Sequence, residues 1–222
     1  MNITRAKYKI LTPINGIEEL RHIEKIGRIC YKSENKITKD GESAKAFVKM
    51  LIENGHEAMI EHSILSVLFT VDRGVSHEMV RHRIASFAQE STRYVNYAKE
   101  RLGNEIKVID ILDGIALDNK MGKMNTFNIF EIVGEWYKAM KNAEKHYMRM
   151  IELGATPQIA RSVLPNSAKI DITITANYRE WRNFFKLRSA PNAHPQMREV
   201  VIQLLKELKE RIAIIFDDIG VM

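Results

Sequence analysis

Cysteine is almost absent from the sequence, which has one, Cys30, among 222 residues. A single cysteine cannot form an internal disulfide bond, and it excludes a cysteine-rich metal site as well. The spacing of Cys30 from Ile23 and Ile26 predicts that it is buried on a helix.

Long hydrophobic runs are also missing. The apolar segment from Ser63 to Val71 is among the longest, whereas a helix that spans a membrane needs about 20 such residues. Residues 1–11 carry Arg5, Lys7 and Lys9, but the apolar stretch and cleavage site of a secretory signal do not follow them. We therefore expect no membrane partner and a cytoplasmic location.

The glycine-rich loops that commonly bind nucleotides are absent too. No Gly-x-Gly-x-x-Gly follows a predicted strand and no Gly-Lys-Ser/Thr loop occurs, which excludes the usual dinucleotide and Walker phosphate sites. A zinc-protease helix is excluded because the His-Glu-x-x-His pattern that starts at His56 has Ile60 where the second histidine belongs. Hence we expect no metal site.

What remains is an ordinary globular composition. Hydrophobic residues make up 45% of the chain and charged residues 28%, which excludes disordered and fibrous classes. The length fits a single domain over residues 1–222. Predicted strands and helices are interspersed without a regular repeat, so we expect an α+β fold with a mixed or antiparallel sheet surrounded by helices.

Hydrophobic periodicity predicts the individual elements. Arg73-Gly74 is the expected turn after the first strand. Ser76 is the expected N-cap of a helix that carries Arg81, His82 and Arg83 near its end. Asn177 and Glu180 form a capping-box-like start for a helix that reaches residue 188. The other expected helices cover residues 17–30, 44–54, 125–153, 157–165 and 194–217, and the expected strands cover residues 63–71, 106–112 and 170–175.

The densest cluster of polar side chains lies at residues 81–94, with the sequence Arg-His-Arg-Ile-Ala-Ser-Phe-Ala-Gln-Glu-Ser-Thr-Arg-Tyr. Guanidinium groups suit phosphate because they donate two parallel hydrogen bonds and keep their charge. The net charge of +6 favours anionic partners without naming one. A basic helix end followed by a solvated turn explains the same composition, so both interpretations stay open at this point.

Several motifs along the chain carry a resemblance to a known family. Arg-His-Arg-x-x-Ser begins at Arg81, and Ser-x-Arg-Tyr follows at Ser91. Gly-His-x-x-x-x-Glu-His occupies residues 55–62, and Ala-Arg-x-x-Leu-Pro occupies residues 160–165. The series continues with Asn177-x-Arg179, Asn183, Leu187-Arg188 and His194-x-Gln196. In order and spacing, these motifs resemble those of the flavin-dependent thymidylate synthases.

The resemblance implies a reaction, namely the reductive methylation of dUMP to dTMP. Methylenetetrahydrofolate is then the carbon donor, and FAD reduced by NADPH is the hydride carrier. The family uses no cysteine nucleophile, and Cys30 lies outside every motif. The resemblance also implies a homotetramer with active sites at subunit junctions.

The same resemblance implies the site residues. Arg188 is the expected catalytic residue, because a fixed cation facing the pyrimidine ring stabilises negative charge that develops on its carbonyl groups. Ser91 is assigned to binding, since no base is predicted beside it and an unactivated serine is a weak nucleophile. The residues expected to bind FAD are His56, Glu61, Arg81, His82, Arg83, Gln89, Asn177, Arg179, Asn183 and His194. The residues expected to bind the substrate are Glu78, Met79, Val80, Arg81, Gln89, Glu90, Ser91, Thr92, Arg93, Arg161 and Arg188.

The chain departs from the family pattern at Ala88-Gln89, where many members have Asn-Glu. Gln89 would then donate an amide hydrogen bond in place of the carboxylate contact, and Glu90 either compensates or faces solvent. The loop between Arg188 and His194 is longer than in some relatives, which leaves the placement of His194 open.

A nucleic-acid-binding module is the alternative from another class of function. The chain is basic, and Tyr94 and Tyr97 lie close to Arg93 in the sequence, an arrangement that suits the stacking of bases. Glu78 and Glu90 interrupt the basic cluster and would repel a continuous phosphate backbone. We therefore expect no nucleic-acid partner.

Overall fold

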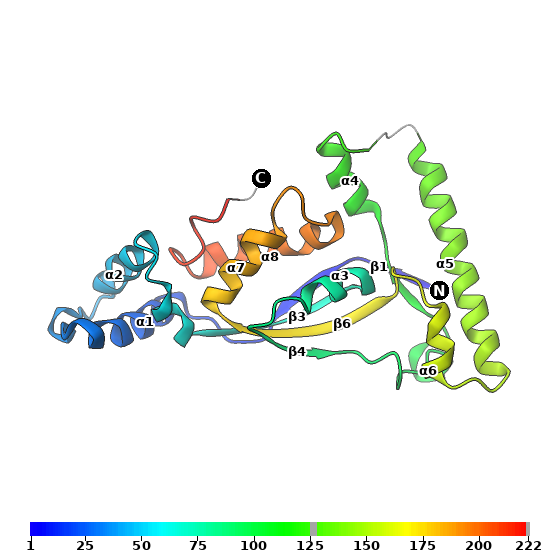
Figure 1. The fold of residues 1–222 in the computed structure, drawn as a ribbon, viewed down its shortest axis with the longest axis horizontal. Coiled ribbons are helices and arrows are strands. Elements are labelled where there is room, and N and C mark those ends of the chain that lie inside the picture. Colours follow the sequence, from blue (N-terminus) through cyan, green and yellow to red (C-terminus); the bar gives the residue numbers. More distant parts are fainter. Residues whose placement is uncertain (125–127, 221–222) are drawn as a thin grey trace. The chain divides into compact units, whose positions relative to one another are not determined.

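The computed structural model describes residues 1–124 and 128–220 (Figure 1). Contacts within the chain divide it into two compact units. The first unit comprises residues 1–8, 69–81 and 87–173, and the second unit comprises residues 9–68, 82–86 and 174–222. The single domain expected over residues 1–222 stays a prediction.

A four-stranded sheet joins strands that lie far apart in the sequence. In sheet order, the strands are β2 (Lys7–Ile10), β3 (Ile64–Asp72), β6 (Lys169–Asn177) and β4 (Ser86–Gln89). Burial alternates along β6, where Ile170, Ile172 and Ile174 are buried, because successive side chains of a strand point to opposite faces. A separate pair joins β1 (Asn2–Thr4) in parallel to β5 (Lys107–Ile109). The α+β class is confirmed.

The first unit has an apolar cluster against its longest helix. Its helices include α3 (Arg73–Met79), α4 (Leu112–Lys120), α5 (Ile129–Glu152) and α6 (Pro157–Ala160), with 3-10 turns η3 (Glu100–Leu102) and η5 (Arg161–Val163). Met140 and Tyr147 of α5 are buried with Tyr97 and Val108, and the rings of Tyr97 and Tyr147 meet edge to face at 5.7 Å. Burial of these apolar side chains is the main source of stability here.

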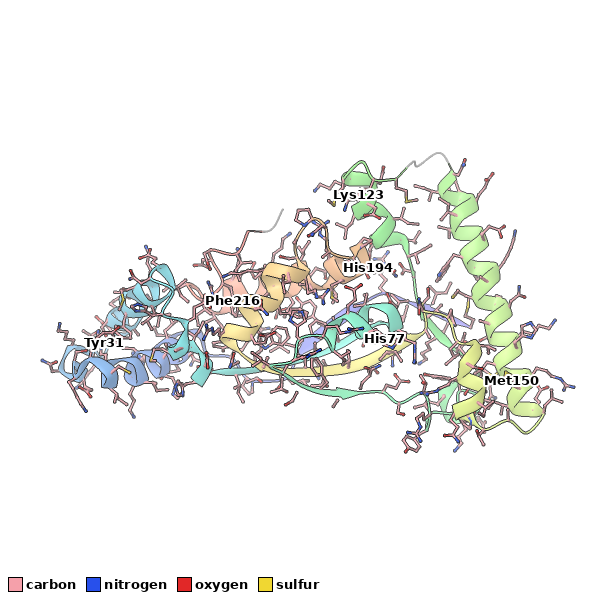
Figure 2. The ribbon with its side chains drawn as sticks, in the orientation of Figure 1. Tyr31, His77, Lys123, Met150, His194 and Phe216 are labelled. Atoms are coloured by element: carbon pink, nitrogen blue, oxygen red, sulfur yellow. The ribbon has the colours of Figure 1, made fainter. Side chains whose placement is uncertain are left out.

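The second unit is centred on aromatic side chains of α7. Its helices include α1 (Gly16–Tyr31), α2 (Glu42–Glu53), α7 (Tyr178–Arg188) and α8 (Pro195–Arg211), with 3-10 turns η1 (Glu34–Lys36) and η2 (Glu57–His62). Trp181, Phe184 and Phe185 are buried. Phe216 of the C-terminal segment, which is labelled in Figure 2, packs edge to face on Phe185. The Trp181 ring N–H donates to the Leu65 carbonyl at 3.0 Å, which fixes α7 against β3.

Most predicted elements are present, including the helices at 16–31, 42–53 and 178–188 and the strands at 64–72 and 169–177. The predicted start of the long helix at Asn125 lies outside the described residues. The C-terminal helix ends earlier than expected, at Arg211, and α4 was not predicted. Among the described residues, no helix is both long and apolar enough to cross a membrane.

Two predictions about single residues were wrong. Cys30 is exposed, because it lies on the solvent side of the last turn of α1. The N-cap of α3 is Asp72, whose carboxylate accepts from the Val75 backbone N–H at 2.7 Å. Ser76 lies inside the helix, where its hydroxyl donates to the Arg73 carbonyl at 3.0 Å. A carboxylate at the end of a strand is a strong N-cap, so the helix begins four residues earlier than a helix capped by Ser76 would.

Candidate functional site

The second unit contains a polar cavity of about 500 Å³, a volume within the range of small-molecule sites. Four residues expected to bind FAD line it: Glu61, Asn177, Arg179 and Asn183. The other lining residues are Glu57, Ile84, Glu180 and Lys186. Helix α7 supplies four of these eight residues, because residues spaced three and four apart along a helix share a face.

The charged groups of the cavity are paired with one another. Arg179 donates to the Glu61 carboxylate at 2.6 Å, and both side chains are largely exposed. Glu57 accepts from buried Arg182 at 3.0 Å, and Arg182 also donates through two nitrogens to Asp218 at 2.6 and 2.8 Å. The pairs made by buried Arg182 hold the cavity wall in place, whereas a pair exposed on both sides such as Arg179 with Glu61 contributes little and separates easily.

His82 connects the cavity wall to the expected catalytic residue. Its Nδ1 lies 2.9 Å from the Glu180 carboxylate, and its Nε2 accepts from Arg188 Nε at 3.0 Å. The ring packs edge to face on Phe184, with centroids 4.8 Å apart. Burial lowers the pKa of the His82 imidazole, and this effect outweighs the hydrogen bond to Glu180, which raises it. Burial therefore favours the neutral form of the His82 ring.

The neighbours of His82 in the sequence, Arg81 and Arg83, are exposed. His56 is exposed as well, at the N-cap of η2. His194 is half-buried at the N-cap of α8. Within the described part of the chain, its buried Nδ1 has no hydrogen-bond partner, and a buried ring nitrogen without a partner is costly unless a ligand or water satisfies it.

In the first unit, two arginines converge on one hydroxyl. Arg73 and Arg161 each donate from Nη1 to Thr92 Oγ1 at 3.3 Å, and Thr92 is only 2% exposed. Neither guanidinium forms an ion pair with a carboxylate among the described residues. Two like charges near one neutral oxygen are unfavourable unless an anion is bound between or beside them.

Glu90, two residues before Thr92 in the sequence, is bonded to strand β6 of the sheet. The Glu90 carboxylate accepts from Lys169 Nζ at 2.9 Å, from the Tyr97 hydroxyl at 3.1 Å and from the Asp171 backbone N–H at 3.3 Å. We expected Glu90 either to compensate for the carboxylate that Gln89 lacks or to face solvent. The second alternative is wrong, because these contacts hold the Glu90 carboxylate inside the unit. Gln89 is exposed and donates only a long contact of 3.4 Å to Ser76.

The remaining residues expected to bind the substrate differ in which of their atoms a ligand can reach. Met79 is fully buried, so only its backbone is available to a ligand, whereas Val80 is exposed. Ser91 is half-buried and its hydroxyl accepts from the Arg93 backbone N–H at 3.4 Å, and Arg93 itself is exposed with its guanidinium over the Tyr94 ring. Glu78 is half-buried on α3.

Sequence reasoning missed two side chains that take part in these arrangements. Arg73 was interpreted only as part of a turn, although its type and its place after a strand are signals for an anion site. Glu180 was interpreted only as a capping residue. Its pairing with His82 depends on two segments 98 residues apart, and no local pattern contains that information.

Comparisons with known proteins agree with the motifs. The family described as thymidylate synthase complementing protein matches residues 15–212. A protein of Corynebacterium aurimucosum named flavin-dependent thymidylate synthase is 32% identical over 201 residues, which cover 88% of this chain and 78% of that protein. Proteins with the same name are 30% identical in Corynebacterium efficiens, covering 95% and 82%, and 32% identical in Pyrococcus abyssi, covering 81% and 68%.

Proposed function

The chain belongs to the flavin-dependent thymidylate synthase family, and from that premise we propose that it converts dUMP to dTMP. The carbon donor is methylenetetrahydrofolate, and the reductant is NADPH acting through FAD. The observation that carries the proposal is the hydrogen bond from Arg188 to His82 beside a polar cavity, because it joins two of the motifs found in the sequence.

The residues of the second unit fit a dinucleotide cofactor. The cavity offers amides at Asn177 and Asn183 and a guanidinium at Arg179, which are donors for phosphate, ribose and ring carbonyl groups. The Nδ1 of His194, which has no hydrogen-bond partner among the described residues, is a further group that a ligand would satisfy. Bound FAD supplies the hydride chemistry, and the protein supplies binding and orientation.

Arg188 is the residue that we assign to catalysis. The pyrimidine of dUMP accepts a hydride poorly until a cation stabilises negative charge on its carbonyl groups. A guanidinium keeps its charge at any physiological pH, so it stabilises that charge without a proton transfer. The hydrogen bond to buried His82 restricts the side-chain torsions of Arg188 and thereby prepares it for this role.

Arg73 and Arg161 are assigned to the phosphate of dUMP. Both guanidinium groups contact Thr92, and neither is neutralised by a carboxylate among the described residues. A phosphate dianion would offset both charges and accept bidentate hydrogen bonds. The Glu90 contacts to Lys169 and Tyr97 hold the start of the loop that carries Thr92.

We also propose that the protein acts as a homotetramer with active sites at subunit junctions and that it is located in the cytoplasm. Both properties stay predictions from the family resemblance and from the sequence. Sedimentation of the purified protein tests the first, since a single species near four times 25.7 kDa is expected.

The visible absorption spectrum of the purified protein, followed by anaerobic NADPH reduction with and without dUMP, tests the function. We expect flavin bands that bleach faster when dUMP is present, and dTMP formation once methylenetetrahydrofolate is added. Free FAD at the same concentration is the control. A colourless protein that cannot be reconstituted with FAD would contradict the proposal and favour nucleic-acid binding.

A further inference from the structure

Glu180 lies at the centre of a small network in the second unit. Its side chain is 9% exposed, and one carboxylate oxygen lies 2.9 Å from His82 Nδ1. Asn183 Nδ2 approaches both carboxylate oxygens at 3.3 Å, and the Glu180 backbone N–H donates to the Asn177 side chain at 2.9 Å. The cap at the start of α7 and the amide of Asn183 thus hold the carboxylate in one place.

The hydrogen bonds of His82 determine where its ring proton lies. A guanidinium has donors only, so the contact from Arg188 Nε requires His82 Nε2 to accept. A neutral imidazole that accepts at Nε2 carries its proton on Nδ1, and this proton is then donated to Glu180. Glu180 therefore selects the tautomer that Arg188 needs.

We propose that Glu180, acting through His82, is a positioning residue that fixes the Arg188 guanidinium in its catalytic orientation. This inference rests on the proposed function, since it takes Arg188 as the group that faces the pyrimidine. The opposite tautomer would present an N–H to the Arg188 N–H, and two donors repel each other. The guanidinium would then leave its place.

A simple salt bridge between Glu180 and His82 does not account for the arrangement. A salt bridge needs a doubly protonated imidazole, which has no lone pair at Nε2 to accept from Arg188. Burial also lowers the pKa of His82 and so opposes the second proton. The contact of Phe184 with the ring at 4.8 Å fixes the ring plane but cannot choose the tautomer.

The test combines histidine ¹⁵N NMR with kinetics on Glu180→Met, which removes the acceptor, and Glu180→Gln, which keeps an oxygen at the same reach. Glu24→Met is the matched control, because Glu24 is a carboxylate of the same unit that is 1% exposed and bonded to Arg28 and Ser43. The His82 resonances among the seven histidines are assigned from the spectrum of His82→Gln.

We expect wild type and Glu24→Met to show His82 protonated at Nδ1 only. Glu180→Met should show the Nε2-protonated form, and its kcat at saturating FAD should fall about tenfold to a hundredfold while dUMP binding changes by less than about threefold, as for a misplaced catalytic group. Glu180→Gln should be intermediate in both tautomer and kcat. If Glu180→Met fails to fold, the same two readouts on Glu180→Gln decide.

An Nδ1-only signal with unchanged kcat in the Glu180 variants would overturn the inference, as would an Nε2-protonated His82 in the wild type. A fall in kcat of equal size in Glu24→Met would overturn it too, because the loss would then be one of general stability. Failure of the proposed function is a separate outcome. In that case the wild type forms no dTMP, but its ¹⁵N NMR spectrum still shows which nitrogen of His82 is protonated.

Discussion

Arg188 combines a fixed charge with a side chain held by a buried acceptor. Arg188→Ala should lower kcat about a hundredfold to a thousandfold, the usual cost of removing a group that stabilises developing charge. FAD should stay bound, because the cavity residues Asn177, Arg179 and Asn183 are unchanged. Turnover and the flavin spectrum are measured on the same sample. Arg149→Ala, at an exposed arginine on α5, is the control, and normal turnover in Arg188→Ala would remove the catalytic assignment.

Arg73 should act on substrate binding. Arg73→Ala removes one charge from the pair that converges on Thr92, and a lost charge-assisted hydrogen bond costs about 1.5–3 kcal/mol. The KM for dUMP is therefore expected to rise about tenfold or more, with a smaller change in kcat. Initial rates over a range of dUMP concentrations measure both constants. An unchanged KM would mean that the phosphate is bound elsewhere.

Individual side chains were partly predictable from the sequence. The charged residues Arg161, Arg179 and Arg188 stand in local motifs, so the sequence alone predicts them as site residues. The pairing of His82 with Glu180 was not, because a hydrogen bond between residues 98 positions apart leaves no local signature. Exposure of Cys30 was missed because apolar neighbours on a helix do not determine which side a final-turn residue faces.

At the scale of elements, the N-cap of α7 offers a test of helix stability. Asn177 accepts from the Glu180 backbone N–H at 2.9 Å, and replacing such a cap by alanine costs about 1 kcal/mol. Asn177→Ala should lower the free energy of unfolding by about that amount, measured by urea denaturation without FAD. Asn15→Ala is the matched control, because Asn15 is the N-cap of α1 but makes no side-chain cap hydrogen bond. Equal losses in the two variants would contradict this explanation.

Elements were predicted best where the sequence repeats a simple period. The alternation of Ile170, Ile172 and Ile174 with polar residues gave β6, and the capping residue Asn177 gave the start of α7. Helix α4 was missed because it has little apolar periodicity to read, with Gly114 its buried residue. The start of α3 was misplaced because Arg73-Gly74 is also typical of a turn.

At the scale of the whole molecule, Arg182 and Asp218 connect stability to pH. Hydrogen bonds from Arg182 lower the pKa of Asp218 below its ordinary value of 3.8. A carboxyl group whose pKa is lower in the folded protein than in the unfolded chain stabilises the fold above the unfolded pKa, and this contribution is lost as the pH falls through the folded pKa. The pair should thus stabilise the protein at neutral pH and stop doing so in acid.

Asp218→Asn should therefore lower Tm at pH 7 and have a shrinking effect as the pH falls below 3.8. Thermal unfolding at several pH values measures the difference from wild type. Glu152→Gln is the control, since the pair of Glu152 with Arg149 is exposed on both sides and such pairs contribute little. A Tm difference for Asp218→Asn that stays constant with pH would exclude the ionic explanation.

The exposed thiol of Cys30 makes the chain suitable for spectroscopy. Because Cys30 is the only cysteine and lies on the surface of α1, a nitroxide reagent attaches once per chain, and no cysteine has to be mutated first. Pulsed dipolar spectroscopy on the labelled protein then counts interacting spins. A homotetramer gives several distances and a deep modulation, whereas a monomer gives none, so this one side chain can report the assembly state in solution.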